Sequence, residues 1–323
     1  MNPFDTPASH LPTTRRGFLR GAAVAASALV LPAPLRALAA PPAPADPSAE
    51  DRERLAEWVR ALRRERLATS DAPLGEAAVR VGELAVGTPY EAFTLEAYLR
   101  AGGSPSRTEP LTLSLTRFDC VSLVESCLAV ARVAARSGAP TWEAFGREME
   151  RMRYRGGVRA GYASRLHYFS EWMADGERRG LLRGLGAELG GEVDRRPLRF
   201  MTEHRKSYPA LADEGVFRAI GALERSLDDR PRRVVPTARI AAVSDRIRTG
   251  DVLAFATAIP GLDVTHSAFA YRDAAGVLRV LHAPLSGGAV EVTRSTLPEY
   301  VAAIRRSTGI LVARPLRGRP VLA

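Results

Sequence analysis

The sequence has 323 residues, of which 46% are hydrophobic and 25% charged, a composition typical of a folded globular protein and contrary to wholesale disorder or a polytopic membrane protein. The formal net charge is +10, from 46 basic and 36 acidic residues. The only two cysteines, Cys120 and Cys127, exclude a disulfide scaffold and a four-cysteine zinc site.

The first 39 residues have the pattern of an export signal. The pair Arg15-Arg16 precedes Phe18, an apolar run over 21–31 and the small residues 37–39, which resemble a cleavage site. The apolar run is too short to span a bilayer. We therefore expect export by the twin-arginine route to the periplasm or another extracytoplasmic location, with no stable membrane span after cleavage.

Removal of residues 1–39, which hold four arginines and one aspartate, leaves a net charge of about +7. That charge favours anionic polymers such as the cell wall, and the absence of nucleic-acid-binding motifs argues against a nucleic-acid partner. We expect a Pro/Ala-rich linker over 40–48, a single domain over 49–317 and a short tail over 318–323.

Helical patterns fill the first half of the domain. Apolar residues at helical spacing predict helices over 49–68, 75–86, 120–135, 142–152 and 167–183. A turn over 87–90 and a Gly-rich irregular segment over 154–164 separate some of them.

The second half is rich in short β-like runs. We expect strands over 251–256, 265–271, 278–283, 290–293 and 310–314, and a helix over 297–306. Helices first and an antiparallel meander second predict an α+β fold rather than a parallel α/β sheet.

The helix predicted over 120–135 begins at a candidate nucleophile. Asp119 is a natural N-cap, so Cys120 lies in the first turn and Cys127 two turns deeper on the apolar face. Seven residues separate their positions by roughly 10 Å, too far for a disulfide. The helix N-terminus should lower the pKa of the Cys120 thiol and make it a nucleophile; a small buried side chain is the equally open alternative. Cys127 is expected in the core.

Two histidines, His266 and His282, flank one predicted hairpin and are the candidate bases. A three-residue loop over 273–275, with Gly276 in a left-handed conformation, would make the two histidines face each other. A two- or four-residue loop would turn one of them to the other face of the sheet. Each could otherwise be a strand histidine satisfied by a hydroxyl or carbonyl group.

The ordered set of motifs resembles the NlpC-type papain-like cysteine hydrolases of bacterial cell walls. The segments that carry the resemblance are GTPY at 87–90, RFDCVSLVE at 117–125, GDVLAF at 250–255, His266, and LHA at 281–283. The segment YASRLHYFSEW at 162–172 is similar to a narrower branch described as N-acetylmuramoyl-L-alanine amidase-like. The match runs from about residue 76 to residue 316.

The resemblance implies a papain-like core with the catalytic cysteine at the N-terminus of a helix packed on the antiparallel sheet that carries the histidines. It assigns Cys120 as nucleophile, His266 as base and His282 as the orienting group. No metal and no cofactor are implied.

The resemblance also implies substrate-binding residues: Tyr90, Asp119, Ser164, Arg165 and His167. Arg165 could clamp a peptide carboxylate or form an ordinary salt bridge. His167 could instead be a satisfied, partly buried histidine. His204 carries no functional pattern and is expected to be structural or on the surface.

The implied activity is a cysteine amidase that cleaves the N-acetylmuramoyl–L-alanine bond of peptidoglycan or its muropeptide fragments. The alternative within the superfamily is an endopeptidase acting on the D-glutamyl–diamino acid bond. Two further classes are a non-catalytic wall-binding module and a zinc hydrolase. The zinc hydrolase would use four histidines and an acid, without a recognised zinc motif: His167, His204, His266, His282 and Asp263.

Overall fold

The computed structural model describes residues 46–286 and 288–317, which fall in the second of two units, residues 41–323. The predicted export signal and the C-terminal tail lie outside the described residues. The predicted linker is described only from residue 46 onward, and Ser48 at its end is the N-cap of the first helix. Among the described residues, no helix is both long and apolar enough to cross a membrane.

The five helices predicted in the first half are present with shifted ends. They are α1 (Ala49–Arg64), α2 (Leu74–Leu84), α4 (Cys120–Ala134), α5 (Trp142–Arg153) and α6 (Phe169–Arg178). The helix α1 ends before the predicted residue 68 because Arg66 adopts a left-handed conformation with φ of 60°. The short helix α3 (Ala97–Arg100) was not predicted.

The strands form one antiparallel sheet, as predicted for an α+β fold. The predicted strands are β4 (Val252–Thr257), β5 (Val264–Arg272), β6 (Leu278–His282), β7 (Glu291–Val292) and β8 (Ser307–Pro315), and the predicted helix is α10 (Leu297–Ala303). Strands β4 to β7 are a meander, and β8 returns to pair with β4. The strand order is β2-β3-β8-β4-β5-β6-β7, with β1 also paired to β8.

Between residues 184 and 250 the sequence analysis predicted no element, yet the structure has several. They are β2 (Glu192–Asp194), α7 (Phe200–Glu203), α8 (Glu214–Ser226), β3 (Arg232–Pro236) and α9 (Ile240–Val243), preceded by β1 (Leu182–Gly184). Most are too short to show periodicity. The exception is α8, which Asp213 caps through the backbone N–H of Val216 at 2.9 Å.

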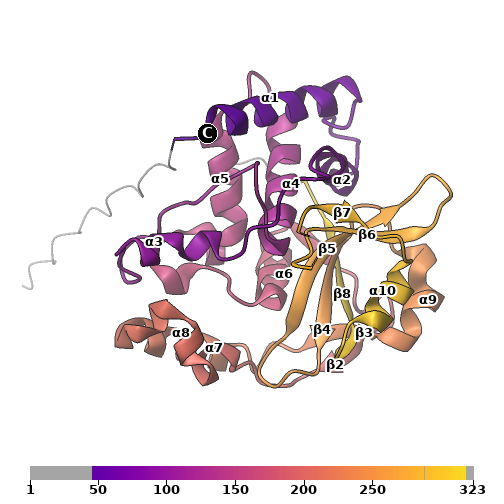
Figure 1. Cartoon of the computed structure of the whole chain (residues 1–323). Helices are drawn as coiled ribbons and strands as arrows, with labels where there is room; N and C mark the ends of the chain where they lie inside the picture. Colours follow the sequence, from indigo (N-terminus) through magenta and orange to yellow (C-terminus); the bar gives the residue numbers. More distant parts are fainter. Residues whose placement is uncertain (1–45, 287, 318–323) are drawn as a thin grey trace, which may run out of the picture. The chain divides into compact units, whose positions relative to one another are not determined.

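Helices cover both faces of the sheet (Figure 1). In β4, Val252 and Ala254 belong to the core that includes α1, α2, α4 and α5, whereas Leu253 and Phe255 belong to the core that includes α9 and α10. Alternate residues of a strand point to opposite faces, so a strand covered on both faces reads as a continuous apolar run. This explains why every residue of β4 is buried.

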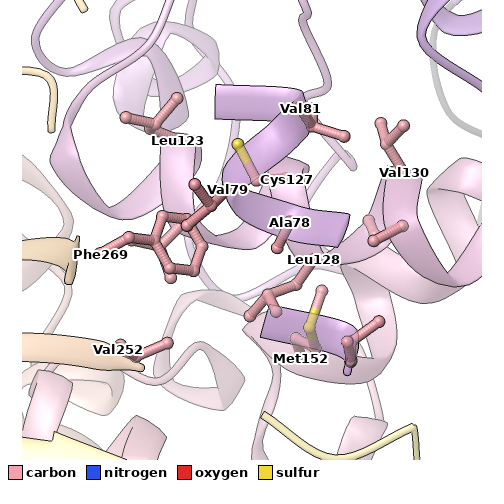
Figure 2. Packing of buried hydrophobic residues seen from close by; sticks show 14 of the residues in the cluster. Ala78, Val79, Val81, Leu123, Cys127, Leu128, Val130, Met152, Val252 and Phe269 are labelled. Carbon is pink, nitrogen blue, oxygen red and sulfur yellow. The ribbon is translucent and has the colours of Figure 1, made fainter. Parts of the chain in front are cut away.

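The helix α4 lies at the centre of the larger core (Figure 2). It packs against α1, α2, α5 and β5, and thirteen of its fifteen residues are buried. Cys127 is fully buried among Val79, Leu123 and Leu128, in the place expected for a core side chain. The direction and depth of α4 therefore depend on contacts along its whole length.

The turn before β4 and the start of α2 are in backbone contact. Gly250 has a φ of 85°, and a Cβ placed there would lie 2.1 Å from the carbonyl carbon of Gly75. The next residue, Asp251, accepts two hydrogen bonds of 2.8 Å from Arg314 of β8. The Gly-Asp pair noticed in the sequence thus joins α2 to the sheet.

We predict that Gly250→Ala destabilises the protein more than Gly276→Ala. Both residues have positive φ, 85° and 79°, so both variants lose about 1–2 kcal/mol from the left-handed backbone. Only Gly250 meets backbone atoms, and overpacking there costs roughly 1–3 kcal/mol more. Thermal unfolding of the two variants measures the difference; equal melting temperatures would contradict the close packing of α2 on β4.

Candidate active site

The thiol of Cys120 is held at the start of α4 by a capping box. The Asp119 carboxylate accepts the backbone N–H of Ser122 at 2.7 Å, and the Ser122 hydroxyl accepts the backbone N–H of Asp119 at 2.9 Å. Cys120 is the first residue of the helix and keeps partial exposure to solvent, in contrast to Cys127. The position of Cys120 at a helix N-terminus is confirmed.

The two histidines of the hairpin are in direct contact. The Nε2 atom of His266 lies 2.8 Å from Nδ1 of His282, with the rings edge to face. Phe255 stacks on His266 with 5.6 Å between ring centroids. The Tyr300 hydroxyl of α10 lies 3.3 Å from Nδ1 of His282. The pair therefore lies on the α10 side of the sheet, enclosed by aromatic rings.

The hairpin has the predicted kind of loop in a different register. Asp273 pairs with Val277 by a 3.1 Å backbone hydrogen bond, so the three-residue loop is 274–276, not 273–275. Gly276 has the predicted left-handed conformation, with φ of 79°. His282 consequently lies opposite position 268 and diagonal to His266. The directly facing register that a 273–275 loop would give is not the one observed, but a slip of two residues keeps both side chains on one face.

A β-bulge immediately precedes His266. Phe255 pairs with His266 and the next residue of β4, Ala256, pairs with Val264, so Thr265 is the extra residue. Bulges bend a strand and increase its twist, and they are frequent beside active sites. The bulge therefore sets the direction of the His266 side chain at the end of the sheet.

The thiol approaches this end of β5 from the α4 side. The N–H and hydroxyl groups of Ser267, the residue after His266, are near enough to the Cys120 sulfur to stabilise a thiolate. The Ser267 hydroxyl is buried and has no hydrogen-bond partner of normal length. Negative charge on Cys120 also contributes to the raised pKa of both Tyr90 and Tyr300. Tyr300 is thus a common neighbour of the thiol and the histidine pair.

The electrostatics of the thiol differ from the prediction. Burial, followed by the Asp119 carboxylate, raises the pKa of Cys120 to about 11; hydrogen bonds from Ser267 and the backbone of Cys120 act in the opposite direction without reversing the shift. The expectation that the helix N-terminus would lower this pKa was wrong, because the cost of removing the thiolate from water exceeds the stabilisation by the helix. The resting thiol is neutral.

Both histidines are neutral as well. Burial lowers the pKa of His266 to about 3, with the neighbouring His282 adding to the effect, and burial lowers the pKa of His282 to about 4. A neutral imidazole can accept a proton, so His266 has the protonation state that a general base requires at neutral pH.

The turn at 87–90 is paired on two sides. The backbone N–H of Tyr90 donates to the carbonyl of Gly288 at 2.8 Å, and Phe118 donates to the carbonyl of Pro89 at 3.0 Å. Tyr90 is therefore tied both to the segment leading into Cys120 and to the loop after His282. Burial raises its pKa to about 12, with the charges of Cys120 and Asp119 contributing. The structure brings Tyr90, Asp119 and Cys120 together.

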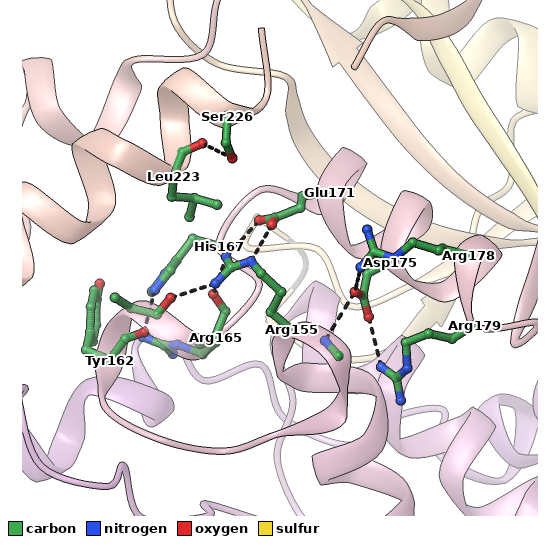
Figure 3. Close-up of polar contacts among 12 residues, drawn as sticks. Arg155, Tyr162, Arg165, His167, Glu171, Asp175, Arg178, Arg179, Leu223 and Ser226 are labelled. Atoms are coloured by element: carbon green, nitrogen blue, oxygen red, sulfur yellow. Dashed lines mark hydrogen bonds and ion pairs between the residues drawn. The ribbon is translucent and has the colours of Figure 1, made fainter. Parts of the chain in front are cut away.

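The other three predicted substrate-binding residues, Ser164, Arg165 and His167, have contacts elsewhere; Figure 3 labels Arg165 and His167 among their neighbours. The Ser164 hydroxyl donates to the carbonyl of Gly161 at 2.8 Å and accepts from the backbone of Ala160 at 2.9 Å, within its own turn. His167 lies 2.9 Å from the carbonyl oxygen of Tyr162, and burial lowers its pKa well below the usual range.

Arg165 is buried and already paired with carboxylates. Its guanidinium lies 2.5 Å from Glu96 and 3.5 Å from Glu109, and 4.9 Å from the centre of the Tyr162 ring. Through these contacts Arg165 links the segment 162–167 to the segment that contains Glu96 and Glu109. A role in clamping a substrate carboxylate stays a prediction, since Glu96 and Glu109, the two ion-pair partners of Arg165, belong to the protein itself.

Three residues near the histidine pair carried no recognised pattern in the sequence: Ser267, Glu291 and Tyr300. Phe255, which stacks on His266, ends the GDVLAF segment but was assigned no role. Ser267 directly follows a candidate histidine and could have been suspected. The others reach the site through strand pairing and through the packing of α10, which no short motif records.

Over residues 46–286 and 288–317, no three His, Cys, Asp or Glu side chains are grouped so as to hold a metal ion. Of the residues named for the zinc alternative, His266 and His282 lie together, and His204 and Asp263 have partners elsewhere. His204 lies 2.8 Å from the carbonyl of Phe200, and Asp263 accepts the backbone N–H of Ser170 at 2.8 Å.

The chain is similar to known amidases. Residues 80–310 match the family described as N-acetylmuramoyl-L-alanine amidase-like (AmiA-like). The crystal structure of an N-acetylmuramoyl-L-alanine amidase from Bacteroides uniformis has 30% sequence identity and a TM-score of 0.67, over 75% of this chain and 99% of that chain. A Bacteroides fragilis protein described provisionally as a xylanase has 31% identity and a TM-score of 0.65, over 72% and 98%.

A more distant neighbour shares the fold. The Legionella pneumophila protein LPG0564, described as DUF1460, has 18% identity and a TM-score of 0.58, over 85% of this chain and 98% of that one. A comparison with curated proteins gave no match. The chain belongs to the N-acetylmuramoyl-L-alanine amidase-like family.

We predict that alkylation of Cys120 by iodoacetamide accelerates with pH up to at least pH 10. The thiolate is the reactive form, and a pKa near 11 keeps its fraction rising over this range. Mass spectrometry after timed quenching gives the rate, and circular dichroism at each pH verifies the fold. The Cys120→Ala variant, which retains buried Cys127, should not react; a rate that levels off near pH 7 would contradict the neutral thiol.

We predict that Arg165→Ala lowers stability by about 3–5 kcal/mol, because it leaves two carboxylates, one of them fully buried, without their partner. The matched control is Arg183→Ala, whose ion pair with Glu188 is exposed and should matter little. Urea unfolding measures both. A raised KM with unchanged stability would instead establish Arg165 as a substrate ligand.

Proposed function

We propose that this protein is a cysteine amidase that hydrolyses the bond between N-acetylmuramic acid and L-alanine in peptidoglycan or its muropeptide fragments. The observation that carries the proposal is the contact of 2.8 Å between His266 and His282 at the end of β5, where the Cys120 thiol meets Ser267. A nucleophile, a base and an orienting group are the components that amide hydrolysis through a thioester requires. The same residues support placing the protein among NlpC-type papain-like hydrolases.

The first half of the reaction begins from neutral groups. The Cys120 sulfur attacks the lactyl carbonyl carbon of the muramic acid while its proton passes to His266, so no thiolate accumulates beforehand. The Cys120 sulfur lies at the end of β5 on the α4 side of the sheet, whereas the two histidines lie there on the α10 side. We therefore infer that the substrate completes the alignment, since catalytic hydrogen bonds often tighten only in the bound complex.

The oxyanion that forms has a donor close by. As the first residue of α4, Cys120 has a backbone N–H without an intrahelical acceptor, and this N–H already lies near enough to its own sulfur to lower the pKa of the thiol. The buried Ser267 hydroxyl, which has no hydrogen-bond partner of normal length, is a second candidate donor. Donors fixed before reaction stabilise the tetrahedral intermediate.

The intermediate then breaks down. The His266 imidazolium returns its proton to the amine of L-alanine, the C–N bond breaks and the stem peptide leaves, with the muramoyl group held as a thioester on Cys120. Water, deprotonated by His266, then attacks the thioester carbonyl and releases the muramic acid carboxylate and the thiol. His282 keeps the His266 ring oriented throughout.

The site does not separate the amidase from one competing function, but it supports the others less well. The D-glutamyl–diamino acid endopeptidase would use the same groups on a different carbonyl, and only the product distinguishes it. A glycosidase needs two carboxylates about 5–10 Å apart, whereas the groups gathered at the end of β5 are a thiol and two imidazoles. A zinc hydrolase would need its dispersed donors to converge. A non-catalytic wall-binding module would release no product.

We also propose that the protein acts outside the cytoplasm after twin-arginine export. Peptidoglycan lies there, and residues 1–39 contain paired arginines, an apolar run and a small-residue cleavage site. The charge of about +7 that remains would favour association with anionic wall polymers.

We predict that wild-type protein releases free stem peptide beginning with L-alanine from defined muropeptides, and that Cys120→Ala loses at least about 1000-fold of this activity because no nucleophile remains. Mass spectrometry of the products gives the bond cleaved. Cys127→Ala is the matched control and should retain activity once its folding is verified. Release of a disaccharide still carrying L-Ala-D-Glu would establish the endopeptidase, and loss of activity with EDTA but not with iodoacetamide would establish a metal mechanism.

A further inference from the structure

A carboxylate on the neighbouring strand β7, that of Glu291, lies close to the ring of His282. Glu291 lies directly opposite His282 in the pairing of β7 with β6. Its Oε1 atom is 3.5 Å from Nε2 of His282; the Glu291 side chain is 50% exposed, whereas that of His282 is 1% exposed. Nε2 of His282 has no hydrogen-bond partner among the described residues, and the Glu291 carboxylate is the acid that lies near it, at 3.5 Å. A buried ring nitrogen therefore has one acceptor within reach, and it is anionic.

Either histidine can be the donor of the hydrogen bond between Nε2 of His266 and Nδ1 of His282. If His266 carries the proton on Nε2 and donates it to Nδ1 of His282, then Nδ1 of His266 keeps a free lone pair. If His282 donates instead, Nε2 of His266 is the acceptor, and its Nδ1 carries the only N–H of a neutral ring. Only the first arrangement leaves His266 able to take a proton from a thiol.

The groups around His282 favour the first arrangement. Because the ring is neutral, it carries a single proton, and a carboxylate facing Nε2 draws that proton to Nε2 and leaves Nδ1 as an acceptor. The contact with Tyr300 is compatible with this arrangement. Burial, with the charges of Glu291 and Cys120 contributing, raises its pKa to about 12, so its hydroxyl stays protonated and can donate to Nδ1 from 3.3 Å.

We propose that Glu291 is a positioning residue that fixes the proton of His282 on Nε2 and thereby leaves Nδ1 of His266 free as the general base. The Nε2–H of His266 then donates to His282 over 2.8 Å, and the Nε2–H of His282 points toward the Glu291 carboxylate, 3.5 Å away. This inference rests on the proposed function, in which His266 accepts the thiol proton. It adds a fourth residue, which does not touch the reacting atoms, to the three taken from the sequence.

Nitrogen-15 NMR of the histidine side chains in the resting protein tests the tautomers without any substrate. In the wild type, both His266 and His282 should be protonated on Nε2. In Glu291→Ala, the His282 signals should shift toward a mixture of tautomers, while Glu291→Gln, which keeps a carbonyl acceptor, should retain most of the Nε2–H form. The control Glu192→Gln removes an exposed acid on β2 and should change neither histidine.

Kinetics on muropeptides test the consequence. Glu291→Ala should lower kcat by about 10–100-fold, the usual effect of removing an outer partner of a histidine, with KM changed less than twofold, and Glu291→Gln should recover most of the loss. Unchanged tautomers in Glu291→Ala, or altered tautomers with full kcat, would each overturn the proposal. If neither wild type nor variants cleave muropeptides, the proposed function fails, while NMR still decides the tautomer assignment.

Discussion

The N-terminus of α4 is fixed by the reciprocal hydrogen bonds between Asp119 and Ser122, and the arrangement of the site depends on where that terminus lies. The helix is buried along nearly its whole length between other helices and the sheet. It cannot rotate or slide without moving Cys127 and its neighbours out of a close-packed core. The packing fixes the position of the helix, and the capping box fixes its first turn. Together they place the Cys120 sulfur beside Ser267.

The same packing determines the protonation states. A thiol at a helix start gains from the helix dipole, but that gain is small compared with the cost of burying a thiolate next to the Asp119 carboxylate. Burial beside Phe255 and Tyr300 acts on the imidazoles in the opposite sense and removes their positive charge. A neutral thiol and a neutral base are the result, so proton transfer and carbon–sulfur bond formation belong to one step of the proposed reaction.

Local sequence signals predicted the parts of the fold that depend on local chemistry. Asp119 and the apolar spacing after it predicted α4, and short β-rich runs predicted β4 to β8 with antiparallel order. The histidine pair was found although the hairpin register was displaced, because a slip by two residues preserves the face. The short elements between 184 and 250, the contributions of Glu291 and Tyr300, and the pKa of Cys120 depend on tertiary contacts between distant segments, which periodicity and motifs do not encode.

The raised pKa of Cys120 also bears on the survival of the protein outside a reducing compartment. Oxidation by peroxide and exchange with small disulfides both proceed through the thiolate, so a sulfur that stays protonated is consumed slowly. Cys127, the only other cysteine, is fully buried two turns away and cannot act as a resolving partner without unfolding α4. A neutral thiol at the proposed nucleophile would therefore slow its oxidation without a protective disulfide.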